Sequence, residues 1–463
     1  MKKFNLCILF ILINQVIFSQ NIVSDTISHS VERKETLFSI SQKYDVDIND
    51  ILELNPELRD SRLRRRSIIL IPVFTSIQEI QPIKLDSLRL SNSILTLDSI
   101  YLKKRKKNDQ LNVSVLLPFR SALINYDSIK EVESLFEDRN LYTIALDFYS
   151  GFLFAIEDLK KLNISVNVNV FDTENSRNKI LQISNNENIT NSDVIIGPII
   201  PRNFETFSNI EFLNAIPKVF PLSTIPINIL KGVVQTVTPR KLLRERMLTY
   251  LDENINKDEN IVIIADSLNQ EIESRLINIF PNSIKIKPEF EGYVLPELLD
   301  SLLVDSIPNK VIIESEIFTL ISSVVSQLNS QITSERDVRL YTTYRGNQFD
   351  DPSINIKDLG NLAFTYSSIS KKTDNDSISE FESSYINLFG SFPNKDIIRG
   401  YDVTRDILLR VLIDNNLNKT IKYDEQSYTE SKFLYKKDTL GGLYNSSIFL
   451  LKHKDYIIEE IID

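Results

Sequence analysis

The chain is almost without cysteine and histidine. Its single cysteine is Cys7, and its two histidines, His29 and His453, stand near opposite ends of the 463 residues. Zinc amidases and endopeptidases need several histidine ligands, and cysteine peptidases need a thiol, so both classes of enzyme are excluded. We expect no metal site, no other cofactor and no catalytic residues.

Glycine is also scarce, with ten residues in the whole chain, well below the usual share of roughly 7%. No dinucleotide-binding, phosphate-binding or nucleophile-elbow sequence can be built from them. The segment Ser368–Lys371 matches S-x-x-K, but its partner motifs are missing and we interpret it as a chance match. A glutamate-dependent glycan hydrolase needs only carboxylates and stays open as a less favoured alternative.

The N-terminal residues have the three parts of an export signal. Lys2 and Lys3 precede the apolar run Leu6–Ile13, and the small residue Ser19 follows at a suitable distance. We therefore predict a signal peptide over 1–20 and an exported protein of the periplasm or cell envelope. The only cysteine lies inside the signal, so the mature protein would carry no thiol, which suits an oxidising compartment. No second run is long enough to span a membrane.

The net charge of the chain limits the classes of partner that it can bind. The formal net charge of −10 argues against nucleic acid and against anionic membranes as general partners. One basic cluster, Lys103–Lys107, closes a polar stretch, 74–110, that we interpret as a linker with one weak helix. The cluster is either a contact for an anionic wall polymer or lipid, or a solvated run at a domain boundary. The second interpretation is favoured.

An ordered block precedes this linker. It reads H-S-V-E-R-K-E-T-L-F-S-I from His29, then I-L-E-L-N-P-E-L, then R-S-I-I-L-I-P-V. The order of turn, short helix, Asn-Pro and closing strand over 27–73 resembles a LysM module, a small βααβ unit that binds N-acetylglucosamine glycans such as peptidoglycan. His29 falls in a strand, which favours a core or surface role.

The LysM resemblance implies a glycan groove between two loops. The residues that it places there are Glu35, Thr36, Leu37, Asn55, Pro56 and Glu57. The Thr36 hydroxyl would suit an acetamido group, but Thr36 is equally placed to cap a helix, and Asn55-Pro56 to form a turn. Lys34-Glu35 and Arg66 stand where the family usually has glycine-aspartate and glycine.

From Leu111 onward, short apolar runs alternate with segments of helical period. We predict strands and helices in turn: strands near 113–117, 165–171, 193–196, 218–222, 233–237, 261–265, 283–287, 310–313, 338–341 and 362–366, and helices near 145–162, 179–183, 203–213, 241–253, 380–388 and 397–412. Continuous apolar strands separated by helices favour parallel sheets covered on both faces. The pattern occurs twice, which predicts an α/β protein with lobes at 111–238 and 239–365 and a C-terminal segment that returns across them.

This arrangement resembles the type I periplasmic-binding-protein fold, as in leucine/isoleucine/valine-binding proteins, over 111–463. The resemblance rests on V-S-V-L-L-P-F, A-L-D-F-Y-S-G-F-L-F-A-I-E-D, D-V-I-I-G-P, V-F-P-L-S-T-I-P, I-V-I-I-A-D and G-Y-D-V-T-R-D-I-L-L. It implies a ligand between the lobes, at the carboxyl ends of the strands. The residues at those ends are Phe119, Gly197, Pro198, Ser223, Thr224, Asp266, Glu314 and Tyr366.

Ser223 and Thr224 are the best placed to bind a carboxylate, as the family's amino-acid binders do with this loop. Two features depart from those binders: Ile199-Ile200-Pro201 replaces an expected serine, and Ser267-Leu268-Asn269 replaces an expected aromatic. The alternative, that strand-end polar groups cap helices and close turns, is therefore favoured.

Two functions follow from these resemblances. The first is a non-catalytic, exported peptidoglycan-binding protein whose lobes close about a small amino-acid-like ligand, with hinges near Pro239 and Tyr366, or bind a partner. The second is a protein-interaction regulator of peptidoglycan synthesis with a degenerate cleft, similar to the outer-membrane activators of peptidoglycan synthases.

Overall fold

The structure, a computed structural model, describes residues 23–31, 36–44, 48–58, 67–74, 95–105, 109–136, 139–289, 292–372 and 378–462. The chain divides into two compact units. One comprises Met1–Ser91 with Asn375–Leu388, and the other Asn92–Asp374 with Phe389–Asp463. The predicted signal peptide, Glu35, Arg66 and the end of the basic cluster lie outside the described residues.

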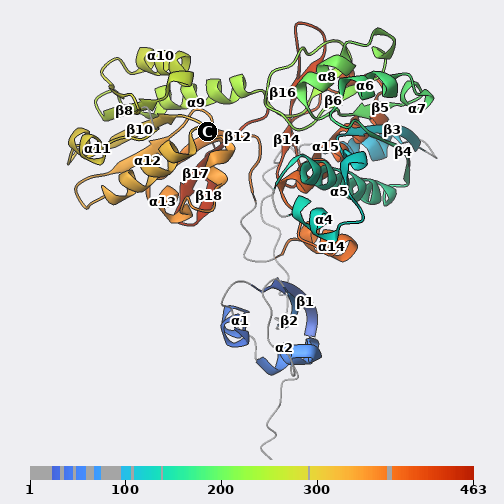
Figure 1. The fold of residues 1–463 in the computed structure, drawn as a ribbon, viewed down its shortest axis with the longest axis horizontal. Helices are drawn as coiled ribbons and strands as arrows, with labels where there is room; N and C mark the ends of the chain where they lie inside the picture. Colours follow the sequence, from blue (N-terminus) through green and yellow to red (C-terminus); the bar gives the residue numbers. More distant parts are fainter. Residues whose placement is uncertain are drawn as a thin grey trace, which may run out of the picture. The chain divides into compact units, whose positions relative to one another are not determined.

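The first unit contains a small βααβ element, as predicted. Strand β1 (Val23–Ser30) pairs antiparallel with β2 (Ile68–Phe74), and α1 (Leu37–Tyr44), α2 (Ile48–Leu54) and the 3-10 turn η1 (Pro56–Leu58) lie between them in the chain. Apolar residues from all of these elements form one core: Val31, Ile40, Ile51, Leu58, Ile69 and Ile71. Figure 1 shows the two helices and the strand pair at the blue end of the colour bar.

The second unit has two α/β lobes, each built on a seven-stranded sheet (Figure 1). The first lobe has strand order β15-β16-β7-β6-β5-β3-β4. Its parallel strands are β3 (Asp109–Leu117), β4 (Ile164–Asp172), β5 (Val194–Ile196), β6 (Lys218–Phe220) and β7 (Val233–Gln235). Its helices are α3 (Leu97–Lys104), α4 (Ile129–Leu135), α5 (Leu141–Lys160), α6 (Arg177–Ser184), α7 (Glu187–Thr190), α8 (Pro201–Ser208) and α15 (Lys395–Ile413).

The second lobe repeats this topology, with strand order β18-β17-β12-β11-β10-β8-β9. Its parallel strands are β8 (Asn260–Ala265), β9 (Ile284–Ile286), β10 (Asn309–Glu314), β11 (Val338–Tyr341) and β12 (Thr365–Ser368). Its helices are α9 (Arg240–Asn254), α10 (Gln270–Ile279), α11 (Pro296–Leu302), α12 (Phe318–Ser330) and α13 (Ile356–Asn361). In both lobes the first strand lies beside the third, which creates a switch point where ligands of such sheets bind.

The C-terminal part of the chain adds strands that the sequence analysis did not predict, all paired antiparallel except for one parallel pairing to the first sheet. After α14 (Glu380–Phe389) and α15, the pair β15 (Tyr435–Lys437) and β16 (Leu443–Asn445) extends the first sheet. The hairpin of β17 (Phe449–Lys454) and β18 (Ile457–Glu460) extends the second, and β13 (Gln426–Ser427) pairs with β14 (Lys432–Phe433). The chain therefore crosses between the lobes three times, whereas hinges were predicted at only two places.

Hydrogen bonds join these three crossings. The Thr238 hydroxyl, just before α9, donates to the carbonyl of Ser447 at 2.6 Å. The amide of Lys371, after β12, donates to the carbonyl of Glu430 at 2.9 Å. Asp402 of α15, which is buried, accepts backbone hydrogen bonds from the segment that includes Glu430. Each crossing is therefore held by hydrogen bonds to protein backbone.

Candidate functional site

The predicted LysM loops divide into an exposed part and a structural part. Thr36 is exposed and its carbonyl accepts the amide of Ile40 at 3.0 Å, so Thr36 stands at the start of α1. Leu37 packs partly against the core. Asn55 is buried, and its amide group donates to the carbonyl of Leu70 at 2.6 Å and accepts the amide of Leu70 at 2.7 Å.

This pattern assigns Asn55 a structural role, because its side chain ties the loop after α2 to strand β2. Pro56 is exposed beside it, and Glu57 follows in the same 3-10 turn. His29 is buried, and its Nδ1 lies 2.9 Å from the hydroxyl of Tyr44, so of the two roles expected, core or surface, His29 has the core role. The exposed groups that remain for a sugar are those around Thr36 and Pro56.

In the first lobe, the residues after β3 and β5 serve the backbone and the core. The ring of Phe119 meets the ring of Tyr149 edge-on at 5.7 Å and packs against the lobe's core. Gly197 has φ of +90°, and an added Cβ would lie 2.2 Å from the carbonyl oxygen of Leu116. Only glycine fits there. Pro198 is buried behind it.

Ser223 and Thr224, the predicted carboxylate binders, are already bonded within the protein. The Ser223 hydroxyl accepts the amide of Ile225 at 3.1 Å, which closes its own turn. The Thr224 hydroxyl lies 3.1 Å from the hydroxyl of Tyr344, which belongs to the second lobe. The Thr224 carbonyl accepts the amide of Arg240 at 2.9 Å. Thr224 thus contributes to a contact between the lobes.

In the second lobe, Asp266 is buried, and both of its carboxylate oxygens accept hydrogen bonds from the protein. One carboxylate oxygen accepts the amide of Leu268 and the side-chain amide of Asn269, both at 2.9 Å. The other oxygen accepts the hydroxyl of Ser315 at 2.6 Å. Asp266 therefore holds the loops after β8 and β10 together at the carboxyl edge of the sheet.

Glu314, at the end of β10, also accepts hydrogen bonds from the protein with both of its carboxylate oxygens. Its two oxygens accept the amide of Thr343 at 2.5 Å and the hydroxyl of Thr343 at 2.8 Å. Burial raises the pKa of the Glu314 carboxyl, and Arg244, 3.7 Å away, opposes that rise. The buried carboxyl ties β10 to the loop after β11.

Tyr366, on β12, lies in an aromatic stack beneath this edge. Its ring lies 5.0 Å from that of Phe364 and 5.8 Å from that of His453, on β17. The guanidinium of Arg345 lies 5.1 Å above the Tyr366 ring. These neighbours bury Tyr366, so its side chain is not exposed for contact with a ligand.

Residues that the sequence analysis missed pair at and beside the boundary between the lobes. Arg240 pairs with Glu316, and its guanidinium stacks 4.0 Å above the ring of Tyr344. Lys395, at the start of α15, pairs with Asp350 at 2.9 Å. Their positions in the sequence could have indicated these residues. Arg240 follows the predicted hinge residue Pro239, and Tyr344 follows the end of a predicted strand.

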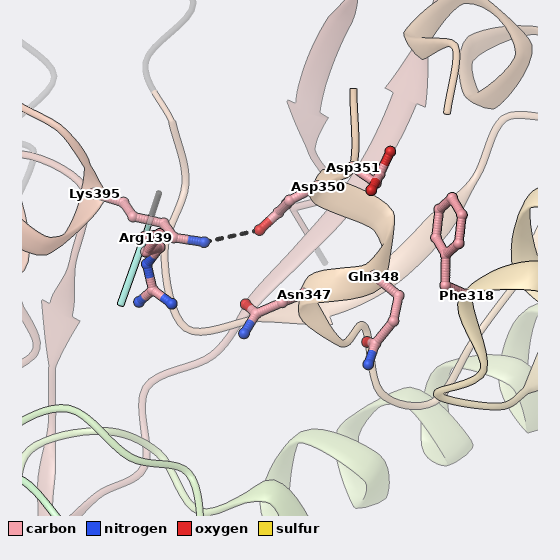
Figure 2. A pocket seen from close by; sticks show the side chains of 7 residues that line it. All are labelled: Arg139, Phe318, Asn347, Gln348, Asp350, Asp351 and Lys395. Carbon is pink, nitrogen blue, oxygen red and sulfur yellow. Dashed lines mark hydrogen bonds and ion pairs between the residues drawn. The ribbon is translucent and has the colours of Figure 1, made fainter. Parts of the chain in front are cut away.

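A cavity of about 390 Å³ lies beside the last of these pairs. Its lining comes from both lobes: Arg139, Phe318, Asn347, Gln348, Asp350, Asp351 and Lys395. Figure 2 shows the Lys395 ammonium directed at Asp350, with Phe318 on the other side of the space. Charges of both signs line it, and Arg139 is already paired with Asp396 at 2.8 Å. None of the predicted cleft residues lines this cavity.

Two further observations bear on the kind of site. Among the residues that the structure describes, no group of three or more histidine, cysteine, aspartate or glutamate side chains could hold a metal ion. Within the same ranges, no helix combines the length and the apolar character needed to cross a membrane.

Comparisons with known proteins support both predicted domains. Residues 29–72 match the LysM domain family. Among solved structures, a putative branched-chain amino acid ABC transporter protein from Rhodospirillum rubrum has a TM-score of 0.52 at 10% identity, over 76% of this chain and 100% of that chain. A branched-chain amino acid ABC transporter periplasmic ligand-binding protein from Burkholderia xenovorans LB400 has a TM-score of 0.49 at 10% identity, over 77% of this chain and 95% of that chain.

Full-length LpoA from Haemophilus influenzae has a TM-score of 0.46 at 12% identity, over 79% of this chain and 61% of that chain. Comparison of the sequence with curated proteins found no match. The predicted resemblances are thus confirmed at the level of fold: residues 29–72 form a LysM domain, and the two lobes that follow have the α/β architecture of type I periplasmic binding proteins.

Proposed function

We propose that this protein is exported to the cell envelope, is held on peptidoglycan by its LysM domain, and binds a partner protein through its two-lobed domain. It has no catalytic role in this proposal. The anchoring half rests on the LysM match and on the exposed loop residues around Thr36 and Pro56. A peptidoglycan synthase is the partner class that such an anchor would bring within reach.

The choice of a partner over a free amino acid rests on one observation. The polar groups at the carboxyl ends of the strands are already paired with protein groups, as Thr224 is with Tyr344, Asp266 with Ser315 and Glu314 with Thr343. A ligand carboxylate would have to replace these bonds, and an exchange of one hydrogen bond for another contributes little net free energy.

A thermal-shift screen against the twenty amino acids and a set of muropeptides tests this choice. A ligand at a hundredfold excess over its Kd stabilises the folded state by about 2.7 kcal/mol, which would raise the Tm by several degrees. We expect no amino acid to do so. A saturable rise that Thr224→Val removes would contradict the proposal, because that variant loses the hydroxyl and keeps the shape.

Sedimentation with purified sacculi tests the anchor. The full chain is expected in the pellet, and a chain without residues 27–73 in the supernatant. Equal distribution of the two proteins would refute anchoring by the LysM domain. A pull-down with purified peptidoglycan synthases then tests the regulatory form of the function.

The cavity next to Lys395 favours a second candidate, capture of a small zwitterion. Its lining holds Arg139 and Lys395 beside Asp350 and Asp351, and a zwitterion there would exchange the pairs Lys395–Asp350 and Arg139–Asp396 for pairs with its own two charges. The same screen decides between the two functions. A small molecule that binds here would lose affinity in Lys395→Ala and keep it in Thr224→Val.

A further inference from the structure

The connection between β3 and α5 contains a helix that leaves large apolar side chains exposed. None of the residues of α4 (Ile129–Leu135) is buried. Four large apolar side chains in and around it are mostly exposed: Leu123 by 64%, Tyr126 by 68%, Ile129 by 76% and Phe136 by 54%. A surface helix normally buries its apolar stripe against its own domain. A cluster of exposed apolar side chains of this kind indicates an interaction site.

The segment is nevertheless held in place at both ends. At its start, the carboxylate of Asp172 accepts the amides of Arg120 at 2.9 Å and Ser121 at 2.8 Å. At its end, the side chain of Asn140, which caps α5, donates to the carbonyl of Leu135 at 2.7 Å. A partner would meet an ordered helix, so little conformational entropy would be lost on binding.

The apolar side chains have the spacing of a docking helix. Ile129 and the half-buried Val132 stand one turn apart in α4, and Phe136, the residue that ends the helix, follows at i+7 on the same side. Amphipathic helices that bind a groove use anchors at this spacing. Ser128 caps the helix by accepting the amide of Glu131 at 3.4 Å, which fixes where the anchors begin.

The charges of the segment select among possible occupants. Residues 121–136 carry three carboxylates, Asp127, Glu131 and Glu133, against one lysine, Lys130. An anionic lipid surface would repel them. A second copy of this chain, with a net charge of −10, is disfavoured by the same like-charge repulsion. A protein groove with a basic rim matches both the apolar side chains and the carboxylates.

We propose that α4 and the apolar side chains beside it, called the α4 surface below, dock into an apolar, basic-rimmed groove of a partner protein. This inference rests on the partner-binding function proposed above and assigns the surface that performs it. Central apolar anchors dominate such interfaces, so Ile129 and Phe136 carry the binding and the carboxylates set its salt dependence.

The test uses the full chain in its native envelope with a photo-crosslinking amino acid at position 129. The matched control is position 268, where Leu268 is 89% exposed in the second lobe. We expect a crosslinked protein at position 129 only. That protein, once purified, should bind the wild-type chain and lose at least tenfold in affinity to the variant Ile129→Ser/Phe136→Ser. Leu268→Ser should change its Kd less than twofold, and Glu131→Lys/Glu133→Lys should weaken binding and flatten its salt dependence.

Several results would overturn the inference. They are crosslinks at position 129 no stronger than at 268, a crosslink to lipid, a crosslinked dimer of this chain, or equal affinity of the purified partner for wild type and Ile129→Ser/Phe136→Ser. An unchanged Tm of the variants shows that they fold. If sacculi retain the chain and no amino acid binds, such a result refutes the α4 surface and leaves the proposed function standing.

Discussion

His453 should make the second lobe sensitive to acid. It is buried on β17, and neither ring nitrogen has a hydrogen-bond partner within the part of the chain that the structure describes. The ring lies 5.7 Å from Phe364 and 5.8 Å from Tyr366. Burial, and next the positive charge of Arg345, lower the pKa of His453 from 6.5 to about 4. Protonation of this ring therefore opposes folding.

The sign and size follow from the two pKa values. The folded state has the lower pKa, so between pH 6.5 and about 4 the unfolded chain binds more protons, and the free energy of unfolding falls as the pH falls. The loss is complete below about pH 4, absent above pH 6.5, and amounts to about 3 kcal/mol. This is a large part of the 5–15 kcal/mol, in order of magnitude, that stabilises a typical domain.

The variant His453→Phe keeps an aromatic ring and removes the titrating group. Urea unfolding at pH 7, 5.5 and 4, with hydrogen exchange of the β12 and β17 amides to follow the second lobe, measures the effect. The stability of wild type relative to the variant should fall by about 3 kcal/mol from pH 7 to pH 4. His29→Gln, in the LysM domain, is the control. A gap between wild type and His453→Phe that stays constant with pH would refute the reasoning.

Four further outcomes are expected from other sites. Gly400→Ala places a Cβ 2.2 Å from the carbonyl oxygen of Phe148 where α15 crosses α5, so urea unfolding should show a loss of roughly 1–3 kcal/mol. Asn55→Ala leaves the buried backbone groups of Leu70 without partners, so circular dichroism should show a LysM domain less stable by roughly 1–3 kcal/mol, whereas Thr36→Val should lower sacculus binding alone. Burial lowers the pKa of Lys218 to about 8, so stability should rise with pH from about 8 to 10.5 in wild type more than in Lys218→Met.

The parallel sheets could be predicted because their strands are continuous apolar runs. The runs around Val113, Val194, Ile261 and Val311 are buried on both faces, and such strands differ in pattern from the amphipathic helices beside them. The predicted strand at 362–366 begins later, at Thr365, because Leu362 and Phe364 are buried in the turn that leads into it.

The C-terminal strands escaped prediction because they lack this pattern. β15 reads Tyr-Lys-Lys and β18 reads Ile-Ile-Glu-Glu, and both lie at the edges of their sheets. Short, charged edge strands resist unwanted pairing with other chains, and the same features hide them from a search for apolar runs. The sequence analysis therefore found the centre of each sheet and missed one edge.

The sequence predicted that the candidate residues stand at strand ends, but it did not predict which groups they bond. Phe119, Asp266 and Glu314 do stand at strand ends, as apolar runs followed by turns predict. Which groups they bond depends on loops that are distant in the chain, such as the segment of Thr343 for Glu314. The stacking of Arg240 on Tyr344 joins the start of α9 to the loop after β11, and a periodicity within one strand carries no information on it.

These pairings affect where a ligand or a partner protein can bind and change the arrangement of the two lobes. A ligand shifts an equilibrium between open and closed lobes only by the difference in its affinity for the two states. Here contacts such as Thr224 to Tyr344 and Lys395 to Asp350 join the two lobes. A ligand in the cleft would compete with these contacts, whereas a partner that binds the α4 surface breaks none of them. Regulation through the outer surface of the first lobe is therefore the energetically simpler route.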